Sequence, residues 1–474
     1  MKLAQLAPGG ADVEIAALAY DSRDVTAGTL FFCVPGERSD GHEHAPDAVA
    51  RGAVALVVER SLGLGVPELL VESARAAMAE IAVRFNGDPS ARLRVAGVTG
   101  TNGKTTSAFL LRALLEAGGE RCALLGTVKS VIGGREQAVA RTTPEAIDLQ
   151  ASFREMLEHG DRACAMEVSS HALALHRVDG TRFAAAVFTN LTQDHLDFHS
   201  SMEDYFAAKT RLFEFDVGVR VVNVDGEYGR RLAAEHPDAV TFALSADADY
   251  TAREVRFAVA GATFRADTPA GEFELRTRLP GSFNVANALG ALATAHSLGV
   301  DLELIAATLP GVAPAPGRFQ ALDEGQPFTV LVDYAHTPDS LENVLRAARS
   351  LTERRLLSVF GCGGDRDRGK RPQMGRISAE LADLTIVTSD NPRSEEPAAI
   401  VEEILTGVDA QADGEVTSIV DRRAAIERAV ELATDGDVVV IAGKGHEQGQ
   451  EFAGGRKVPF DDAQVARGAL RSRG

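Results

Sequence analysis

The sequence lacks several features that would each direct it to a particular class of protein. It has only four cysteines and no CxxC pair, which favours reduced, packed thiols over a disulfide framework. No apolar run approaches the ~20 residues of a membrane-spanning helix. The apolar stretch at the N-terminus is too short for a secretory signal. Together these absences predict a cytoplasmic protein that is not inserted in a membrane.

An excess of basic charge is also absent, because the formal net charge is −19. Nucleic acids and anionic membranes both need a basic footprint, so neither is expected as the main partner. If the ligand is itself an anion, basic residues must gather locally in its site. The chain does have 474 residues, of which 45% are hydrophobic and 25% charged. This is the balance of a globular protein with roughly three domains of ~150 residues.

The most informative stretch is Thr99–Thr106, which reads TGTNGKTT. It follows an apolar run at 93–98 that predicts a strand, and it opens a helical pattern that stops at Gly118. A strand, a glycine loop, Lys-Thr and a helix form a cradle for phosphate, because backbone N–H groups and the helix N-terminus face the anion. The general P-loop pattern would place its first glycine at Val98, so the match is imperfect. A plain glycine-rich turn is the alternative, but this context favours a nucleoside triphosphate site.

Two stretches rich in turn residues, 86–90 and 309–317, divide the chain. We therefore expect a small α/β domain at 1–86, a central domain at 87–313 and a C-terminal domain at 314–474. Within the central domain, 251–280 alternates like short antiparallel strands. In the last segment strands alternate with helical patterns, which predicts a doubly wound parallel sheet. Its expected strands are 329–332, 356–360, 384–388, 416–420 and 438–441.

Polar clusters follow four of these last strands. Because ligands bind beyond the carboxyl ends of parallel strands, the clusters should share one edge of the sheet. Arginine grips carboxylates in a bidentate way and aspartate can hold an ammonium, so this edge would suit an amino acid or a diamino diacid. A network of salt bridges is the alternative. The clusters are Asp333–His336, Gly361–Arg366 with Arg368, Lys370 and Arg371 after it, Asp390–Arg393 and Gly443–Glu447.

A triphosphate site also needs Mg²⁺, which prefers oxygen ligands. Thr105 is one candidate ligand, and Glu167 is another because it ends an apolar run; a capping or salt-bridged glutamate is the alternative. The run Asp194–His199 holds two histidines and two aspartates, which suggests a second metal site or a proton-transfer site. Each histidine taken singly could equally be structural. Lys209, taken alone, predicts an exposed surface lysine.

These motifs resemble the Mur ligase family over essentially the whole chain. The family's loop reads TGTNGKTT, which explains the departure from the general P-loop spacing. The resemblance implies a three-domain α/β fold with a small N-terminal α/β domain, a central P-loop ATPase-like domain and a C-terminal Rossmann-like domain. It rests on Thr99–Thr106, Met166–Leu173, Phe188–Asp197, Phe283–Ala288, Pro316–Phe319 and Asp333–Pro338.

The resemblance is strongest to the ligases that add the third peptide residue in peptidoglycan synthesis. It implies an ATP- and Mg²⁺-dependent enzyme, expected to be a monomer. This enzyme would join meso-2,6-diaminopimelate to the D-glutamate of UDP-N-acetylmuramoyl-L-alanyl-D-glutamate through an acyl phosphate. The alternatives are the same reaction with L-lysine or another diamino acid, a folylpolyglutamate-type synthetase, and a non-catalytic nucleotide switch.

The family's nucleotide and metal roles carry over by position. Lys104 would meet the β- and γ-phosphates, Thr105 and Glu167 would hold one Mg²⁺, and His195 would hold a second with a carbamylated Lys209. Arg318 and Asp333 would reach the phosphates and ribose from a C-terminal domain that rotates about 309–317. The nucleotide set is Gly100, Thr101, Asn102, Gly103, Lys104, Thr105, Thr106, Asn287, Arg318 and Asp333.

The family's substrate roles carry over in the same way. Tyr20 and Ser22 lie in the uridine-binding segment, and Glu37–Gly41 matches a nearby uridine loop. Thr142, Thr143, Ser169 and Arg177 match residues that hold the muramoyl dipeptide; Leu175 stands where relatives often have glutamine.

For the amine, the matching residues are Arg366, Asp390, Asn391, Pro392, Arg393, Gly443 and Glu447. A guanidinium at Arg393 would pair with the second carboxylate of meso-diaminopimelate and repel the lysine ε-ammonium.

Overall fold

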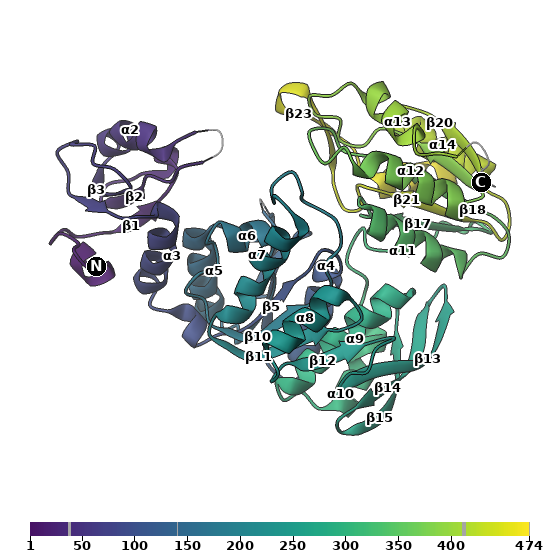
Figure 1. Ribbon diagram of the computed structural model, residues 1–474, viewed down its shortest axis with the longest axis horizontal. Coiled ribbons are helices and arrows are strands. Elements are labelled where there is room, and N and C mark those ends of the chain that lie inside the picture. Colours follow the sequence, from purple (N-terminus) through teal and green to yellow (C-terminus); the bar gives the residue numbers. More distant parts are fainter. Residues whose placement is uncertain (37–38, 140, 410–413, 474) are drawn as a thin grey trace. The chain divides into compact units, whose positions relative to one another are not determined.

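The computed structural model describes residues 1–36, 39–139, 141–409 and 414–473, and its elements are labelled in Figure 1. The chain divides into two compact units. The first comprises Met1–Thr99, Gly119–Val187 and Ala208–Arg220, and the second comprises Gly100–Gly118, Phe188–Ala207 and Val221–Gly474. Domain limits at 86 and 313 stay a prediction.

The first unit begins with a four-stranded parallel sheet in the order β1-β2-β3-β4. Consecutive side chains of a strand point to opposite faces, so both faces of this apolar sheet must be covered. Leu30 and Phe32 pack on the side of α3, whereas Phe31 packs on the side of α2. The elements are α1 (Leu3–Leu6), β1 (Ala17–Ala19), β2 (Thr29–Phe32), α2 (Ala45–Ala50), β3 (Ala53–Val58), β4 (Glu68–Leu70) and α3 (Ala74–Phe85).

The rest of the first unit contains six strands in the order β10-β5-β9-β6-β7-β8. β5, β9 and β6 are parallel, and β7 and β8 continue as an antiparallel hairpin. β5 is the strand expected before the glycine loop. The elements are β5 (Arg94–Thr99), β6 (Cys122–Leu125), β7 (Ser130–Ile132), β8 (Arg135–Gln137), α5 (Ala146–Glu158), β9 (Ala163–Glu167), α6 (Ser170–Ala174) and β10 (Phe183–Phe188).

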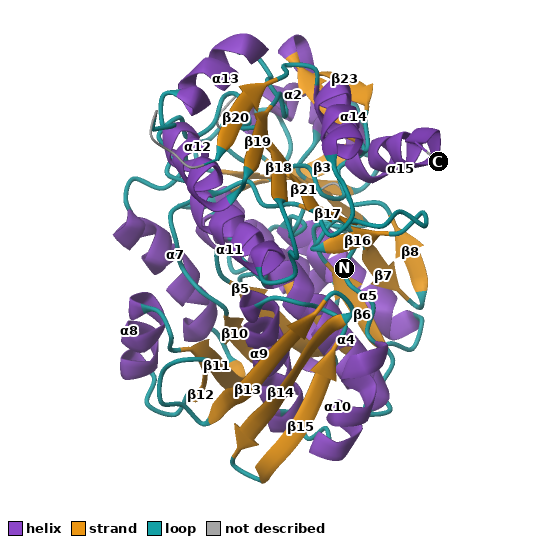
Figure 2. Cartoon of the chain, turned by 90° about the vertical axis from the view of Figure 1, so that its right-hand side faces the viewer, coloured by secondary structure: helices purple, strands orange, loops and turns teal. Residues whose placement is uncertain are grey.

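The second unit contains the helix predicted after the glycine loop, α4 (Lys104–Ala117), which packs against α9 (Ser282–Ser297). It also contains a run of strands in the order β15-β14-β13-β12-β11. β13, β14 and β15 form an antiparallel meander, which confirms the alternation read at 251–280 (Figure 2). The remaining elements are α8 (Glu227–Glu235), β12 (Val240–Ala243), β13 (Tyr250–Ala258), β14 (Gly261–Thr268), β15 (Gly271–Thr277) and α10 (Leu302–Thr308). Two elements, α7 (Met202–Glu214) and β11 (Val217–Asn223), have residues in both units.

The C-terminal sheet has six strands in the order β16-β17-β21-β18-β19-β20. β16 is antiparallel and the other five are parallel, which confirms the predicted sheet. The elements are β16 (Gln320–Leu322), β17 (Thr329–Asp333), α11 (Pro338–Arg349), β18 (Leu356–Phe360), α12 (Lys370–Leu381), β19 (Leu384–Val387), α13 (Pro397–Leu405), β20 (Glu415–Ser418), α14 (Arg422–Leu432), β21 (Val438–Ala442), β22 (Gly449–Phe452), β23 (Arg456–Pro459) and α15 (Asp462–Arg473).

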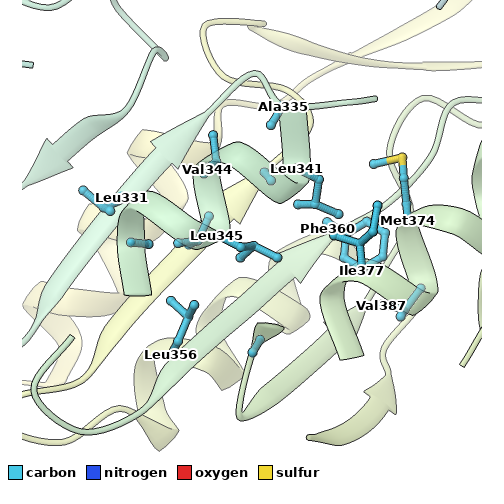
Figure 3. Close-up of a cluster of buried hydrophobic side chains, with 14 of the residues drawn as sticks. Leu331, Ala335, Leu341, Val344, Leu345, Leu356, Phe360, Met374, Ile377 and Val387 are labelled. Atoms are coloured by element: carbon cyan, nitrogen blue, oxygen red, sulfur yellow. The ribbon is translucent and has the colours of Figure 1, made fainter. Parts of the chain in front are cut away.

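Two hydrophobic clusters cover the two faces of this sheet, as a doubly wound fold requires. One joins the strands to α11, α12 and α13, and Figure 3 shows Leu341 of α11 near Phe360 of β18 and Ile377 of α12. The other joins the strands to α14 and α15 through Ile426 and Val465. Both helical layers are therefore fixed to strands whose carboxyl ends carry the polar clusters.

Three further observations bear on the sequence predictions. The turn at 86–90 is packed, because Pro89 and Ser90 are buried and the Ser90 hydroxyl accepts a hydrogen bond from Arg182 N. All four cysteines are free and buried, as expected. Within the described ranges, none of the helices combines the length and apolar character needed to cross a bilayer.

Candidate functional site

The glycine loop is held in shape by the segment that follows β10. Gly100 and Gly103 have positive φ angles of 147° and 87°. A Cβ atom at Gly100 would lie 1.9 Å from Thr189 Oγ1, so only glycine fits there. Thr189 Oγ1 donates to Asn102 O at 2.6 Å, and Asn190 Oδ1 accepts from Asn102 N at 2.9 Å. The segment after β10 therefore fixes a loop that opens onto the N-terminus of α4, the arrangement that phosphate binding requires.

Lys104 follows this loop directly, and Arg318 contacts the residue after Lys104. Lys104 Nζ donates to the carbonyl oxygens of Gly100 at 2.9 Å and Thr101 at 2.8 Å. Arg318 Nη2 donates to Thr105 Oγ1 at 3.1 Å, and its guanidinium stacks 4.5 Å from the Tyr334 ring. Among the described residues, the buried Nε of Arg318 has no hydrogen-bond partner. The structure thus brings together two cations that the sequence assigned separately to phosphate.

Asn287 and Asp333, the other predicted nucleotide residues, are also buried. A Cβ atom at Gly103 would lie 2.3 Å from Asn287 Oδ1, so Asn287 lies against the loop. Asp333 accepts hydrogen bonds from Phe319 N at 2.6 Å and Ala335 N at 2.7 Å. Burial nevertheless raises the pKa of the Asp333 carboxyl.

Glu167 lies where the sequence predicted it, at the end of β9. Its carboxylate accepts from Thr127 N at 2.7 Å and from Thr127 Oγ1 at 3.0 Å. Thr127 Oγ1 in turn lies 3.0 Å from Thr142 Oγ1. The end of β9, the loop after β6 and the predicted dipeptide-binding segment are therefore linked by hydrogen bonds.

His195 and its neighbours form a charged cluster. His195 has a positive φ of 56°, and its Nε2 lies 3.5 Å from Asp194 Oδ2. Burial favours the neutral acid, but the charges of His195, His336 and Lys370 outweigh it and lower the pKa of Asp194 to about 2. His199 is buried and stacks on Tyr205 with ring centroids 4.9 Å apart. In the described part of the chain, no three or more His, Cys, Asp or Glu side chains are grouped as a metal site.

The burial of Lys209 contradicts the expectation of a surface lysine that was drawn from this residue alone. Taken alone it was expected on the surface, but it is only 1% exposed on α7. Its neighbour Tyr205 is also fully buried, so this face of α7 points into the protein. A buried lysine is costly unless its charge is balanced or removed, which makes the position unusual for an ordinary helix lysine.

The predicted residues of the first unit contact acidic and backbone groups of that unit in two separate places. Tyr20 Oη donates to Asp148 Oδ2 at 2.9 Å, and burial together with Asp148 raises the Tyr20 pKa to about 12. Arg177 Nη2 pairs with Glu145 Oε1 at 2.9 Å, and its Nη1 donates to Thr143 O at 3.3 Å. Burial lowers the Arg177 pKa.

Ser169 and Ser22 complete this set of predicted residues. Ser169 Oγ accepts from Ala172 N and so caps α6, which Leu175 ends. Ser22 is buried directly after Asp21. Glu37 and Arg38 lie outside the described residues.

The amine residues predicted at the carboxyl edge of the C-terminal sheet come together. Asn391 Nδ2 donates to Glu447 Oε2 at 2.9 Å. Arg393 Nε pairs with Glu451 Oε2 at 3.1 Å, and its Nη1 donates to Gly364 O at 2.7 Å. Pro392 is buried in the same loop.

Asp390 is buried beside this network. Its Oδ1 accepts from Asn391 N, but among the described residues its Oδ2 has no hydrogen-bond partner. A Cβ at Gly443 would lie 2.5 Å from that oxygen, which explains the glycine. The edge therefore offers the Arg393 guanidinium for a carboxylate and the unused acceptor of Asp390 for an ammonium group. A zwitterionic amino acid carries both of these groups.

The four cations after Gly364 do not all belong to this site. Arg371 is fully buried and pairs with Glu395 at 2.7 Å and Glu403 at 2.8 Å, and Arg368 pairs with Glu403 as well. These two form the salt-bridge network that was the alternative interpretation. Arg366 is different, because its side chain is half-exposed and lies 3.6 Å from Asp197.

Sequence reasoning missed Lys444, although it lies inside a motif that was singled out. Its side chain is fully buried, and its Nζ donates to Asn391 Oδ1 at 2.8 Å and to Glu447 Oε2 at 2.9 Å. Glycines on both sides of a lysine gave a signal, but only the fold shows that this lysine holds two other site residues. Asp148 was also missed, and it carried no motif of its own, whereas Glu145 ends the quoted run Thr142–Glu145.

Comparisons with known proteins show the family of the chain. Three family models match the chain: "Mur ligase family, catalytic domain" at residues 14–86, "Mur ligase middle domain" at 98–295 and "Mur ligase, glutamate ligase domain" at 317–445. A UDP-N-acetylmuramoyl-L-alanyl-D-glutamate–2,6-diaminopimelate ligase from Geobacillus kaustophilus is 47% identical, covering 98% of this chain and 96% of the relative. The ligase of the same name from Streptomyces coelicolor is 47% identical, covering 99% of this chain and 95% of the relative.

Solved structures give the same result. A UDP-N-acetylmuramoyl-L-alanyl-D-glutamate–2,6-diaminopimelate ligase superposes with a TM-score of 0.72 at 34% identity, covering 100% of this chain and 99% of the other. A MurF ligase from Thermotoga maritima in complex with ADP has a TM-score of 0.69 at 18% identity, covering 97% of this chain and 98% of the other, and so supports the fold alone. On the strength of these full-length similarities, the chain belongs to the Mur ligase family.

Proposed function

We propose that the protein is an ATP-dependent ligase of peptidoglycan synthesis. It joins meso-2,6-diaminopimelate to the D-glutamate of UDP-N-acetylmuramoyl-L-alanyl-D-glutamate and releases ADP and phosphate. The support for this reaction is that curated relatives named for it are 42–47% identical over nearly the whole chain. The observation in the structure that carries the amine assignment is the buried, unpartnered Asp390 Oδ2 in the same loop as Arg393.

The reaction proceeds in two steps. The D-glutamate side-chain carboxylate attacks the γ-phosphorus of ATP, the bond to the bridging oxygen breaks, and ADP leaves. The amine of diaminopimelate, having lost a proton, then attacks the acyl carbon; the amide bond forms and phosphate leaves. Lys104, at the head of α4, offsets the charge that develops on the transferred phosphoryl group. Arg318, which donates to Thr105 beside Lys104, has the same role.

The side chains proposed as Mg²⁺ ligands fit that ion. The Thr105 hydroxyl and the Glu167 carboxylate offer oxygen atoms, which Mg²⁺ prefers. His195 and Lys209 are proposed for the second ion, and the burial of Lys209 supports its carbamylation, because a carbamate replaces an ammonium with oxygen ligands. Bound Mg²⁺ would neutralise phosphate charge in the first step.

The other predicted side chains bind and orient the substrates. Tyr20 and Ser22 are proposed to hold the uridine end, and Thr142, Thr143, Ser169 and Arg177 the dipeptide end. In the C-terminal domain, Arg393 is proposed to pair with the second carboxylate of diaminopimelate, whereas Asp390 and Glu447 accept hydrogen bonds from its ammonium group. A closing movement about 309–317 would exclude water, which otherwise hydrolyses the acyl phosphate.

The test is phosphate release by the purified protein with ATP, the UDP-dipeptide and one amine at a time. We expect release with meso-diaminopimelate and far less with L-lysine or L-glutamate. Lys104→Ala serves as the control that removes catalysis without touching the amine site. Release with L-lysine alone would contradict the proposed amine, and release with L-glutamate alone would favour a folylpolyglutamate-type activity. ATP binding without release for any amine would contradict ligase activity altogether.

A further inference from the structure

Arg422 is a fully buried cation that no motif in the sequence singles out. It is the first residue of α14, and its side chain has no solvent exposure. Its Nε donates to Asp462 Oδ1 at 2.8 Å and its Nη2 to Asp462 Oδ2 at 2.7 Å. Asp462 is the first residue of α15 and is equally buried. The two helices that cover one face of the C-terminal sheet are therefore joined by a bidentate ion pair.

The same guanidinium also holds the ends of two strands. Arg422 Nη2 donates to Ala442 O at 2.9 Å, and its Nη1 donates to Ser389 O at 3.3 Å. Ala442 is the last residue of β21, and Ser389 follows β19 by two residues. These strands are not neighbours, because β18 lies between them in the sheet. Arg422 thus bridges two loops that the sheet's own hydrogen bonds do not connect.

Each of these carbonyl groups immediately precedes a proposed amine-site residue. Ser389 precedes Asp390, and Ala442 precedes Gly443. Arg422 Nη1 lies 3.9 Å from Asp390 Oδ2, which is too far for a hydrogen bond but close enough for electrostatic attraction. The unpartnered oxygen is therefore held between a buried cation and the backbone of Gly443, where no Cβ fits.

We propose that Arg422, held by Asp462, is the positioning residue of the amine site. Together with Lys444, which already links Asn391 and Glu447, it sets the distance between the Asp390–Arg393 loop and the Gly443–Glu447 loop. It also keeps the second oxygen of Asp390 directed at the amine. Arginine is required because its planar fork supplies donors to two carbonyl groups and a carboxylate at once, whereas a lysine ammonium is a point charge. This inference rests on the proposed function, since the loops matter only if they bind the amine.

The chain offers a matched control at the opposite edge of the same sheet. Arg355 precedes β18 and pairs with the buried Asp437, which precedes β21, at 2.7 Å. Arg355 Nη2 also donates to a backbone carbonyl, Leu432 O, at 2.8 Å. The pair resembles Arg422–Asp462 in chemistry, although the Arg355 side chain is 43% exposed and that of Arg422 is fully buried. The residues it joins have no proposed role in binding substrate. Substitutions there report the cost of losing an ion pair in this domain without moving the amine loops.

The experiment measures kcat and the KM for each of the three substrates in the full-length enzyme. For Arg422→Lys we expect the KM for meso-diaminopimelate to rise about tenfold or more, because two of the contacts made by the guanidinium group are lost. The KM values for ATP and the UDP-dipeptide should stay within about twofold of wild type. Arg355→Lys should leave all three KM values within the same limit. Asp462→Asn keeps the shape of the pair and should raise the amine KM alone, by less.

The results separate this inference from the proposed function. A wild-type enzyme that does not use meso-diaminopimelate would contradict the function itself. A wild-type enzyme that does use it, with an equal amine KM in Arg422→Lys and Arg355→Lys, would overturn the positioning role. If Arg422→Lys does not fold, Asp462→Asn decides, and an unchanged amine KM in that variant would overturn the inference. Equal rises in all three KM values would also overturn it, because they indicate a general structural effect.

Discussion

The two edges of the C-terminal sheet both carry buried aspartates, but the hydrogen bonds of these acids differ. At the amino edge, Asp437 accepts from Arg355 N at 3.0 Å, from Arg355 Nη2 at 2.7 Å, and from Thr434 N at 2.8 Å and Oγ1 at 3.0 Å. At the carboxyl edge, Asp390 Oδ1 accepts from Asn391 N, while among the described residues its Oδ2 accepts from none.

The difference distinguishes two uses of a buried acid. Burying a charged group is costly unless hydrogen bonds and an opposite charge compensate it. Asp437 is fully compensated within the protein, so it stabilises the fold and has no acceptor left for a ligand. Asp390 keeps one acceptor in reserve, and a ligand ammonium would supply the missing donor. The carboxyl edge is therefore built to be completed by a ligand, whereas the amino edge is already complete.

The largest expected effect is at the carboxyl edge. Asp390→Asn keeps the size of the side chain but removes the charge that would hold the ammonium. A hydrogen bond to a charged group contributes about 2–3 kcal/mol, so the KM for meso-diaminopimelate should rise about 30- to 150-fold. Steady-state kinetics with each substrate varied in turn measures this. A rise in this KM below threefold, or a matching rise in the KM for ATP, would contradict the claim that Asp390 binds the amine and so differs in role from Asp437.

A smaller effect, on stability rather than binding, is expected at the amino edge. Arg355→Ala leaves Asp437 buried without its cation, but the Arg355 side chain is 43% exposed, so the loss is discounted for solvent screening. We expect the free energy of unfolding to fall by about 1–2 kcal/mol, with an unchanged KM for the amine. Urea unfolding followed by circular dichroism, together with amine kinetics, tests this. A changed amine KM with unchanged stability would reverse the roles assigned to the two edges.

The smallest effect concerns the pH dependence of that stabilisation. The Asp437 pKa is about 2, because hydrogen bonds from Arg355 and Thr434 outweigh the effect of burial. In the unfolded chain the pKa is about 3.9, so the unfolded state binds the proton more readily. The stabilisation is therefore present above about pH 4 and is lost as the pH falls towards 2. The difference in unfolding free energy between wild type and Arg355→Ala should stay constant from pH 7 to 5 and shrink below pH 4. A difference that grows on acidification would contradict this assignment.

Much of the fold could be predicted from the sequence because its signals are local. Apolar runs ended by polar clusters gave the parallel strands of the C-terminal sheet and the edge at which the clusters meet. The run Thr99–Thr106 gave the strand, loop and α4. Period-two alternation gave the meander at 251–280. Each of these follows from neighbours along the chain.

The remaining features could not be predicted because they depend on contacts distant in sequence. Lys209 lies in a helical pattern that does not by itself distinguish a buried from an exposed lysine, and it is buried because its face of α7 points into the protein. Arg371 and Arg366 belong to one basic cluster in sequence, yet only Arg371 meets two glutamates from α13 and the loop before it. Arg422 resembles any charged residue at a helix start until the carbonyl groups of Ser389, after β19, and Ala442, at the end of β21, are placed beside it.

The most direct test of the central claim compares Arg393→Ala with wild type, using both meso-diaminopimelate and L-lysine as the amine. The claim is that the carboxyl edge selects the amine by its second carboxylate, which lysine lacks. We predict that kcat/KM for meso-diaminopimelate falls at least about 30-fold in the variant, whereas the low kcat/KM for L-lysine stays the same or rises. Equal losses with both amines would contradict the claim, because they would show that Arg393 does not distinguish the carboxylate.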